Sequence, residues 1–370
     1  MKTTFFKKQL LFITMFFLFF SNATASILNV GTTLDLSRGA KQLGQSTKAG
    51  IELAIKTANN NNIVLSYYDD QYKIKIARDS FKKMLESNIP FILCPVGGEI
   101  IKQSVDIIEN KNIMIVFPLP SITLPSGKYK KQCINFGPTY AEYAKIVTQH
   151  LASEITPKKI VILYQDDSSG NLLLKKSKEI LEEANIRLVT LPFTSNNVSQ
   201  ILEHIKTTKI EKPDCIGIFG PPSVTKKFIK KCGPTFCSEI TFMITALEDS
   251  SLIRFMTDQK LKFIGANVIP DPQSSSLPIM KEFCINAKEN NVKIDMTSAQ
   301  AYICTSIFTD VISKVSNPTP IASFNEFTKL NNYQFKGLEL TYNPKTLTVS
   351  NKLWLHTING SWEEKTQTNV

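Results

Sequence analysis

Hydrophobic and polar positions follow two alternating patterns along the chain. Short, mainly apolar runs predict strands, and each is followed by a segment whose apolar residues recur at helical spacing. In the first third of the chain this predicts strands at residues 27–33, 63–68, 90–96 and 112–117, and helices at residues 42–59, 76–86 and 99–109.

The same pattern begins again near residue 140. Helices are predicted at residues 140–153, 171–184, 198–207 and 224–231, and strands at residues 159–164, 186–193, 214–219, 240–246 and 261–269. Two long helical stretches follow at residues 277–290 and 298–315, and residues 337–362 have the pattern of short strands and turns. Strands that alternate with helices favour a parallel sheet covered on both faces.

Because the pattern runs twice, we expect an α/β fold of two doubly wound parallel-sheet lobes. Tight-turn signals at Gly137-Pro138 and Pro270-Asp271-Pro272 predict hinge crossings between the lobes. The predicted N-terminal lobe comprises residues 26–138 and 273–335, and the predicted C-terminal lobe comprises residues 139–272 and 336–370. Ligands bind beyond the carboxyl ends of the strands in such sheets, so two facing lobes would enclose a cleft.

The N-terminus has the features of a secretory signal peptide. Three lysines precede an apolar run from Leu10 to Phe20, and Ala23-Thr24-Ala25 is a small-x-small site for cleavage before Ser26. The apolar run is shorter than the ~20 residues that span a bilayer, which disfavours a membrane anchor. No Cys stands at the cleavage point, which disfavours a lipoprotein. We therefore expect residues 1–25 to be removed and the protein to be periplasmic.

Length and charge limit the class of protein further. Removal of the first 25 residues would leave 345 of the 370 residues, too many for one ordinary core. It would also lower the formal net charge from +11 to +8, because the segment carries three Lys and no acid. The remaining excess is scattered, although Lys226, Lys227, Lys230 and Lys231 cluster at a spacing typical of a solvated helix face. We expect no nucleic-acid partner, because that function needs a motif as well as charge.

Cysteine and histidine usage indicates neither catalysis nor a metal site. The three His are far apart, and the chain has no Gly-x-Ser-x-Gly, phosphate-loop or His-Glu-x-x-His motif. We expect no enzyme activity, no cofactor and no metal. The seven Cys leave at least one thiol unpaired within the chain. An oxidising compartment would permit a disulfide between Cys232 and Cys237, but spacing alone cannot fix the geometry that a disulfide requires.

Several segments fall in a characteristic order along the chain. The stretch from Leu36 to Asn59 carries Gly44, Gly50 and Ala54, where Gly50 and Ala54 would let a helix pack close to a sheet and Gly44 would let the chain approach a ligand. The later segments are Tyr68-Asp69-Asp70-Gln71, Cys94-Pro95-Val96-Gly97-Gly98, Phe117-Pro118-Leu119-Pro120-Ser121, Asn135-Phe136-Gly137-Pro138-Thr139, Val161 to Gly170, and Gln334 to Tyr342. In this order the chain resembles type I periplasmic binding proteins, with the leucine/isoleucine/valine-binding group as the best match.

The resemblance implies a role and partners. Members of that family capture a small-molecule solute between two hinged lobes, and most deliver it to a membrane ABC permease. We expect the same of this chain, acting as a monomer. Two alternatives stay open, namely a ligand-sensing co-receptor without transport and a non-binding paralogue. A hydrolase would need a nucleophile with a positioned base, and no such pair is recognisable.

The resemblance also implies where the solute would bind. The family holds an amino acid's carboxylate with backbone N–H groups and hydroxyls from two loops of the first lobe. The corresponding loops are Gly97-Gly98-Glu99 and Pro120-Ser121, where Gly97 and Gly98 would donate N–H groups and Ser121 a hydroxyl. A hydroxyl residue is usual where this chain has Gly98, and Glu99 would oppose a ligand carboxylate if it pointed inward.

The second lobe departs from the family pattern more strongly. The acid that usually meets an α-ammonium is replaced by Ala246, with Glu248 two residues further on. Ser169 and Leu43 stand where aromatic residues are usual, and Tyr140 stands where an acid often makes a polar contact. The charge clamp for a zwitterion is therefore incomplete, which discriminates against that ligand. An amino acid, an amide, a short peptide and another small polar solute all stay open.

Overall fold

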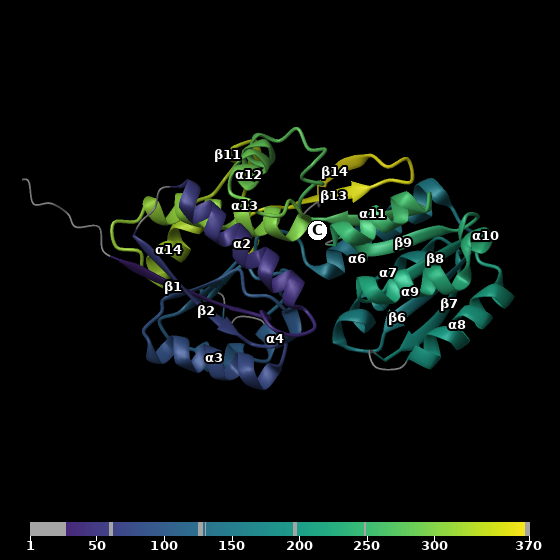
Figure 1. The fold of residues 1–370 in the computed structure, drawn as a ribbon, viewed down its shortest axis with the longest axis horizontal. Helices are drawn as coiled ribbons and strands as arrows, with labels where there is room; N and C mark the ends of the chain where they lie inside the picture. Colours follow the sequence, from purple (N-terminus) through teal and green to yellow (C-terminus); the bar gives the residue numbers. More distant parts are fainter. Residues whose placement is uncertain are drawn as a thin grey trace, which may run out of the picture.

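A computed structural model describes the two predicted lobes. It covers residues 27–58, 62–124, 129, 131–194, 198–247 and 249–366. The predicted signal peptide and Glu248 lie outside the described residues. The lobes lie side by side (Figure 1).

The first lobe is built on a five-stranded parallel sheet in the order β2-β1-β3-β4-β5. Its strands are β1 (Leu28–Leu34), β2 (Ile63–Asp69), β3 (Phe91–Leu93), β4 (Met114–Val116) and β5 (Cys133–Ile134). All residues of β3 and β4 are buried, which explains why both appear in the sequence as continuous apolar runs.

Helices cover both faces of this sheet because successive strand residues point to opposite sides. Phe91 and Leu93 pack with α2 (Lys41–Thr57), α12 (Pro278–Glu289), α13 (Met296–Ser313) and α14 (Pro320–Phe327). Ile92 packs on the other side with α3 (Ile74–Glu86), α4 (Gly98–Lys102) and α5 (Val105–Ile108). Figure 1 shows α2 and α13 on one side of the strands and α3 on the other.

The second lobe contains a seven-stranded sheet in the order β14-β13-β10-β9-β8-β6-β7. The parallel strands are β6 (Lys159–Gln165), β7 (Arg187–Phe193), β8 (Cys215–Phe219), β9 (Thr241–Ala246) and β10 (Lys262–Asn267). The antiparallel hairpin β13 (Lys352–His356) and β14 (Trp362–Thr366) extends this sheet beyond β10.

Two groups of helices cover the second sheet. One face packs against α8 (Val198–Glu211), α9 (Pro222–Cys232) and α11 (Ser250–Asp258), and the short α10 (Pro234–Cys237) follows α9. The other face packs against α7 (Ser168–Glu183) and α6 (Tyr140–His150), which continues as a π-helical turn, Leu151–Ile155. The fold of two doubly wound lobes is therefore confirmed.

The described chain passes between the lobes after β5, after β10 and after the hairpin of β11 (Tyr333–Phe335) and β12 (Leu338–Leu340). Asn135 ties the first and last crossings together, because its N–H donates to the Leu347 carbonyl at 2.7 Å and its carbonyl accepts from the Val349 N–H at 3.1 Å. The first and second crossings touch at Gly137, where an added Cβ would lie 2.6 Å from Val268.

The lobe boundaries remain a proposal. The hydrophobic core of the first lobe supports one change to the predicted boundaries, because it includes Leu340 and Val349. We therefore propose that the last crossing lies at residues 350–352, immediately before β13, instead of at residue 336.

Some elements differ from the sequence prediction. The helix predicted at residues 99–109 is divided into α4 and α5, and the buried Ser104 hydroxyl donates to the Ile100 carbonyl at 2.8 Å at the interruption. The helices α11 and α14 were not predicted. No helix in the described part of the chain is long and apolar enough to cross a membrane. All seven Cys, Cys232 and Cys237 included, are free thiols.

Two glycines of the first predicted helix have roles other than those expected. Gly44 lies inside α2, where an added Cβ would lie 2.1 Å from the Asp35 carbonyl oxygen, so it makes room for the preceding loop. Gly50 faces α13, and an added Cβ would lie 2.2 Å from the Ser298 carbonyl oxygen. The close approach that Gly50 permits is therefore to a helix, whereas the sequence suggested a sheet.

Candidate functional site

The carboxyl ends of the two sheets face each other. Glu99 follows β3 in the first lobe and Ser168 follows β6 in the second, and the Ser168 hydroxyl donates a hydrogen bond of 2.7 Å to the Glu99 carboxylate. Figure 1 shows α4 at the edge of the first lobe nearest the second. We use the name interlobe face for the described residues that follow β1, β3 and β4 in the first lobe and β6 and β9 in the second.

The two loops predicted for the first lobe are in contact. An ideal Cβ on Gly98 would lie 3.6 Å from Pro120, which follows a cis peptide bond with Leu119. Ser121 is half-buried, and neither its hydroxyl nor the Gly98 N–H has a hydrogen-bond partner among the described residues. The structure therefore brings Gly98, Pro120 and Ser121 together. The Gly98 N–H and the Ser121 hydroxyl are available to donate hydrogen bonds to a solute.

Gly97 differs from the expectation that it donates an N–H group to a solute. Its N–H already donates to the Leu119 carbonyl at 2.9 Å, which joins the two loops. Its φ of +103° is in the region that favours glycine, so its role in the structure is to turn the chain into α4.

Glu99 points across to the second lobe. One carboxylate oxygen accepts from Ser168, and the other accepts from Gln103 Nε2 at 2.6 Å. These two donors, Gln103 first, hold the pKa of Glu99 below its usual value. Because both oxygens are used, the carboxylate is held in a contact between the lobes, which the sequence did not predict.

Three further acids at the strand ends of the first lobe also accept hydrogen bonds from groups within the protein. Asp35 accepts from the backbone N–H groups of Ser37, Arg38 and Ala40, and Asp69 accepts from those of Leu36 and Gln71. Asp70 is fully buried, so desolvation raises its pKa although it accepts from the Thr33 hydroxyl and the Tyr72 N–H. These acids order the loops that lead into α2 and α3.

The strand end of β6 contributes Gln165 and Ser169. Asp167 caps α7 by accepting from the Gly170 N–H at 2.8 Å, which positions the half-buried Ser169 in the first turn. Gln165 donates to Asp167 at 2.6 Å, and its buried Oε1 has no hydrogen-bond partner among the described residues. Sequence reasoning missed Gln165, although a polar residue directly after the apolar run from Ile160 to Tyr164 was an available signal.

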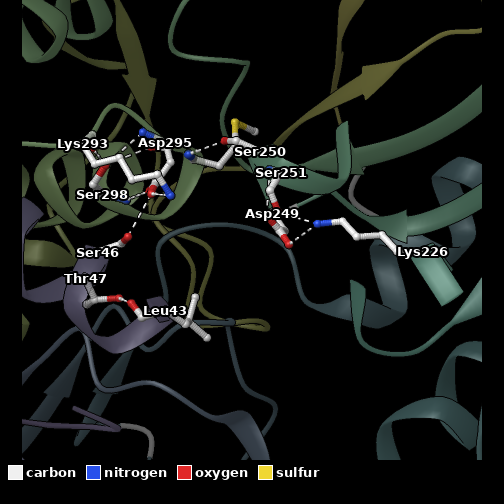
Figure 2. Close-up of polar contacts among 11 residues, drawn as sticks. Leu43, Ser46, Thr47, Lys226, Asp249, Ser250, Ser251, Lys293, Asp295 and Ser298 are labelled. Carbon is white, nitrogen blue, oxygen red and sulfur yellow. Dashed lines mark hydrogen bonds and ion pairs between the residues drawn. The ribbon is translucent and has the colours of Figure 1, made fainter. Parts of the chain in front are cut away.

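The strand end of β9 carries an acid that is already paired. Glu248 lies outside the described residues, and the next residue, Asp249, caps α11 by accepting from the Ser251 N–H at 2.7 Å. Lys226 lies 3.7 Å from the Asp249 carboxylate and donates to the Ser251 hydroxyl at 2.5 Å (Figure 2). Lys226, interpreted from the sequence as part of a solvated helix face, is therefore the counter-ion of Asp249.

Leu43 and Tyr140 lie at the border between the lobes. Leu43 is half-buried on α2, and Figure 2 shows its side chain directed toward the second lobe. Tyr140 makes an edge contact with Tyr143, with ring centroids 5.5 Å apart, and packs partly against the cores of both lobes. A second polar contact joins the lobes nearby, where the Met296 N–H donates to the Ser250 hydroxyl at 3.0 Å.

This arrangement is suited to binding. In the part of the chain that the structure describes, no group of three His, Cys, Asp or Glu side chains could hold a metal ion. The interlobe face offers hydrogen-bond donors and acceptors from both lobes, with an apolar side chain, Leu43, at its edge. Fold and site together define a two-lobed α/β binding protein.

The comparisons with known proteins identify the family. Residues 28–361 match the family model described as "Periplasmic binding protein", and the chain belongs to this family. Because the family consists of solute-binding proteins that do not catalyse reactions, the expectation that the chain is not an enzyme is confirmed. No match was found among curated proteins.

Solved structures share the fold at low sequence identity. A possible leucine/isoleucine/valine-binding protein from Rhodopirellula baltica has 18% identity and a TM-score of 0.77, covering 93% of this chain and 97% of its own. A branched-chain amino-acid ABC transporter protein from Thermus thermophilus with bound valine has 15% identity and a TM-score of 0.77, with coverages of 92% and 95%. An ABC-transporter solute-binding protein from Rhodopseudomonas palustris with 3,4-dihydroxybenzoic acid has 15% identity and a TM-score of 0.72, with coverages of 92% and 97%.

Proposed function

We propose that this protein captures a small polar solute between its lobes, in the periplasm, and delivers it to a membrane ABC permease. The observation that carries the proposal is the hydrogen bond between Glu99 and Ser168, which brings the strand ends of the two sheets together. A solute at this interlobe face would contact both lobes. It would therefore stabilise the closed arrangement relative to an open one.

Unpartnered polar groups support the same location. The Gly98 N–H, the hydroxyls of Ser121 and Ser169, and the Gln165 Oε1 have no partner among the described residues. The buried Gln165 Oε1 is costly to leave without a partner, so a solute that donates to it gains affinity, and the three half-buried groups offer further hydrogen bonds. They come from both lobes, as a solute-dependent closure requires.

The solute class that we propose is an amino acid, an amide or a short peptide. The similar structures contain valine in one case and 3,4-dihydroxybenzoic acid in another, so proteins of this fold accept solutes with and without an α-ammonium. In this chain the described acid next to the expected ammonium position, Asp249, already has Lys226 as its counter-ion. An uncharged amide or peptide end therefore suits the described groups at least as well as an α-ammonium.

A thermal-shift screen of amino acids, amides and short peptides tests the proposal. A solute at 100 times its Kd raises the free energy of unfolding by about 2.7 kcal/mol, which raises the thermal midpoint. Small-angle scattering with the best solute should show a smaller radius of gyration. Ser121→Ala should weaken binding, whereas the matched change Ser238→Ala, at an exposed position directly after α10, should not.

Two results would contradict the proposal. One is a panel in which no solute stabilises the protein. The other is a solute that binds tightly, with the same affinity for Ser121→Ala, and leaves the radius of gyration unchanged. Solute binding without capture by permease-containing vesicles would favour the co-receptor role over delivery.

A further inference from the structure

A cavity of about 210 Å³ lies where the crossings between the lobes meet, outside the interlobe face. The first crossing contributes Phe136, the second contributes Val268 and Leu277, and the last contributes Ser350 and Lys352. The Ser350 N–H donates to the Phe136 carbonyl at 2.8 Å, which joins the first and last crossings at the cavity wall. The connections that a lobe rotation must bend therefore line one small space.

The other walls of the cavity come from both lobes. The hairpin of β11 and β12 supplies Leu338 and Glu339 from the first lobe, and the Ile279 N–H of α12 holds its turn by donating to the Lys336 carbonyl at 3.0 Å. The sheet of the second lobe supplies the half-buried Trp354. Because a lobe rotation changes the spacing of these walls, a molecule that contacts both is bound best at one lobe angle.

The charged side chains of the cavity leave one carboxylate without a counter-ion. Two Glu and one Lys line the cavity, and Lys352 lies 2.7 Å from the Glu364 carboxylate. The Glu339 carboxylate has no partner among the described residues. Lys336, in the turn of the same hairpin, is already paired with Glu282 at 2.6 Å. The excess charge of the cavity is therefore negative, which favours a cation.

The remaining lining is apolar and suits a small hydrocarbon body. Phe136 and Val268 are buried, and Trp354 supplies an indole, the ring that attracts an ammonium ion most strongly. Liquid water occupies about 30 Å³ per molecule, so the cavity has the volume of roughly seven waters. A compact organic ammonium ion of about that many non-hydrogen atoms matches this volume and this lining.

We propose that the cavity at the crossings binds a small organic ammonium ion with a compact apolar body, and that the bound ion favours the closed arrangement of the lobes. The ammonium group lies between the Glu339 carboxylate and the Trp354 indole, and the hydrocarbon body packs against Phe136, Val268 and Leu277. The ion makes contacts with both lobes only at the lobe angle of this structure. By linkage it raises the affinity of a solute at the interlobe face, a step that rests on the proposed function.

Cyclohexylammonium chloride is the probe, and cyclohexanol, which has the same ring and no charge, is its matched control. Isothermal titration calorimetry with the folded full chain measures both affinities. We expect cyclohexylammonium to bind about tenfold more tightly, because the cation–π and carboxylate attractions each contribute a factor of roughly two to five. Small-angle scattering without solute should show a smaller radius of gyration when the ion is bound.

Replacing the unpaired carboxylate tests where the ion binds. Glu339→Gln, at an exposed position, should lower the affinity for cyclohexylammonium about two- to fivefold and leave that for cyclohexanol unchanged. Glu289→Gln, an exposed acid at the end of α12, is the matched control and should change neither affinity. Ser121→Ala, which removes a hydroxyl of the interlobe face, should also leave the affinity for cyclohexylammonium unchanged.

The proposal is overturned if cyclohexylammonium does not bind, if cyclohexanol binds as tightly, or if Glu339→Gln keeps the full preference for the charged probe. Weaker cyclohexylammonium binding in Ser121→Ala also overturns it, because the ion would then lie at the interlobe face. So does a bound ion that leaves the radius of gyration unchanged. A solute panel without a single binder contradicts the proposed function, whereas the calorimetric test of the cavity needs no solute and decides independently.

Discussion

At the residue scale, Glu99 connects the two lobes through a single carboxylate. The Gln103 side chain, one helical turn further on, fixes one oxygen and leaves the other directed at Ser168. A hydrogen bond to a charged group stabilises more than one between neutral groups. Because Glu99 is only half-buried, solvent screening reduces that gain.

Replacing Glu99 tests whether this contact favours the closed arrangement. Glu99→Ala should shift the equilibrium between closed and open lobes by about 1 kcal/mol toward the open form, because the interlobe hydrogen bond is lost. Small-angle scattering without solute should then show a larger radius of gyration. Glu86→Ala, an exposed acid at the end of α3, is the control, and an equal change in that variant would contradict the prediction.

The same contact predicts a pH dependence. The pKa of Glu99 is lowered from 4.5 in this arrangement. The stabilisation of the closed arrangement by the Glu99–Ser168 contact is therefore fully present above pH 4.5 and is lost as the pH falls through the lowered pKa. We expect the radius of gyration to rise on acidification below pH 4.5. Glu99→Gln should show no such step, and a step of equal size in that variant would assign it to another group.

Gly97 and Gly98 are neighbours with opposite tolerance to substitution. Gly97→Ala should lower the free energy of unfolding by about 1–3 kcal/mol, because φ is +103° and the added Cβ would lie 3.2 Å from Ile100 and Tyr72. Gly98→Ala should change it by less than about 0.5 kcal/mol, because its Cβ would make ordinary contacts at 3.6 Å. Urea denaturation measures the free energy of unfolding of both variants, and equal destabilisation would contradict the different roles of the two glycines.

At the element scale, the packing of α2 against α13 holds the first lobe together. The Ser46 hydroxyl on α2 donates to Asp295 at 2.9 Å, and Asp295 caps α13 by accepting from the Ser298 N–H at 2.9 Å (Figure 2). Lys293 adds an ion pair to the same carboxylate at 3.1 Å. The N-terminal end of α13 is thus fixed beside Ser250 of the second lobe.

Gly50 permits this helix packing. Gly50→Ala should lower the free energy of unfolding by about 3 kcal/mol, because the new methyl group would lie 2.2 Å from the Ser298 carbonyl oxygen and backbone cannot move away as a side chain can. Gly39→Ala is the matched control, since its Cβ would meet nothing within 4 Å. Thermal and urea unfolding measure both variants, and a stable Gly50→Ala protein would refute this account.

At the scale of the whole molecule, the crossings form a region where both lobes meet. A cavity of about 210 Å³ lies there, lined by Phe136, Leu277 and Leu338 on one side and by Trp354 of β13 on the other. Trp354 pairs with Asn267 of β10, so it belongs to the sheet of the second lobe. Rotation of one lobe against the other must therefore change the surroundings of this indole.

Intrinsic fluorescence should follow lobe closure. The chain has two Trp, and Trp354 lies in the cavity between the lobes, so a bound solute should shift its emission. Trp354→Phe should remove most of the response and leave solute affinity unchanged. If Trp354→Phe kept the full emission shift and Trp362→Phe lost it, the indole whose surroundings change would be that of Trp362 in β14.

The order of elements and the fold class were predictable, because buried parallel strands and amphipathic helices leave clear local patterns. The strand at residues 112–117 and the helix at residues 298–315 correspond to β4 and α13 within a few residues. The interruption between α4 and α5 was not predictable, because the apolar residues on both sides of Ser104 keep helical spacing. Likewise, Gly97, Gly98 and Ser121 were named from the resemblance, but the sequence did not show which of their N–H and hydroxyl groups are already hydrogen-bonded within the protein.

The sequence alone determined that the chain alternates strands and helices twice, because hydrophobic periodicity is a local property of neighbouring residues. It also contained the ordered segments that mark the family. Only the tertiary structure decided which polar groups are already used. Glu99 binds Ser168 across 69 positions of sequence, and Gly97 donates to Leu119 across the loop, since hydrogen bonds depend on proximity in space. Proximity of this kind arises only when both sheets are folded and their strand ends meet.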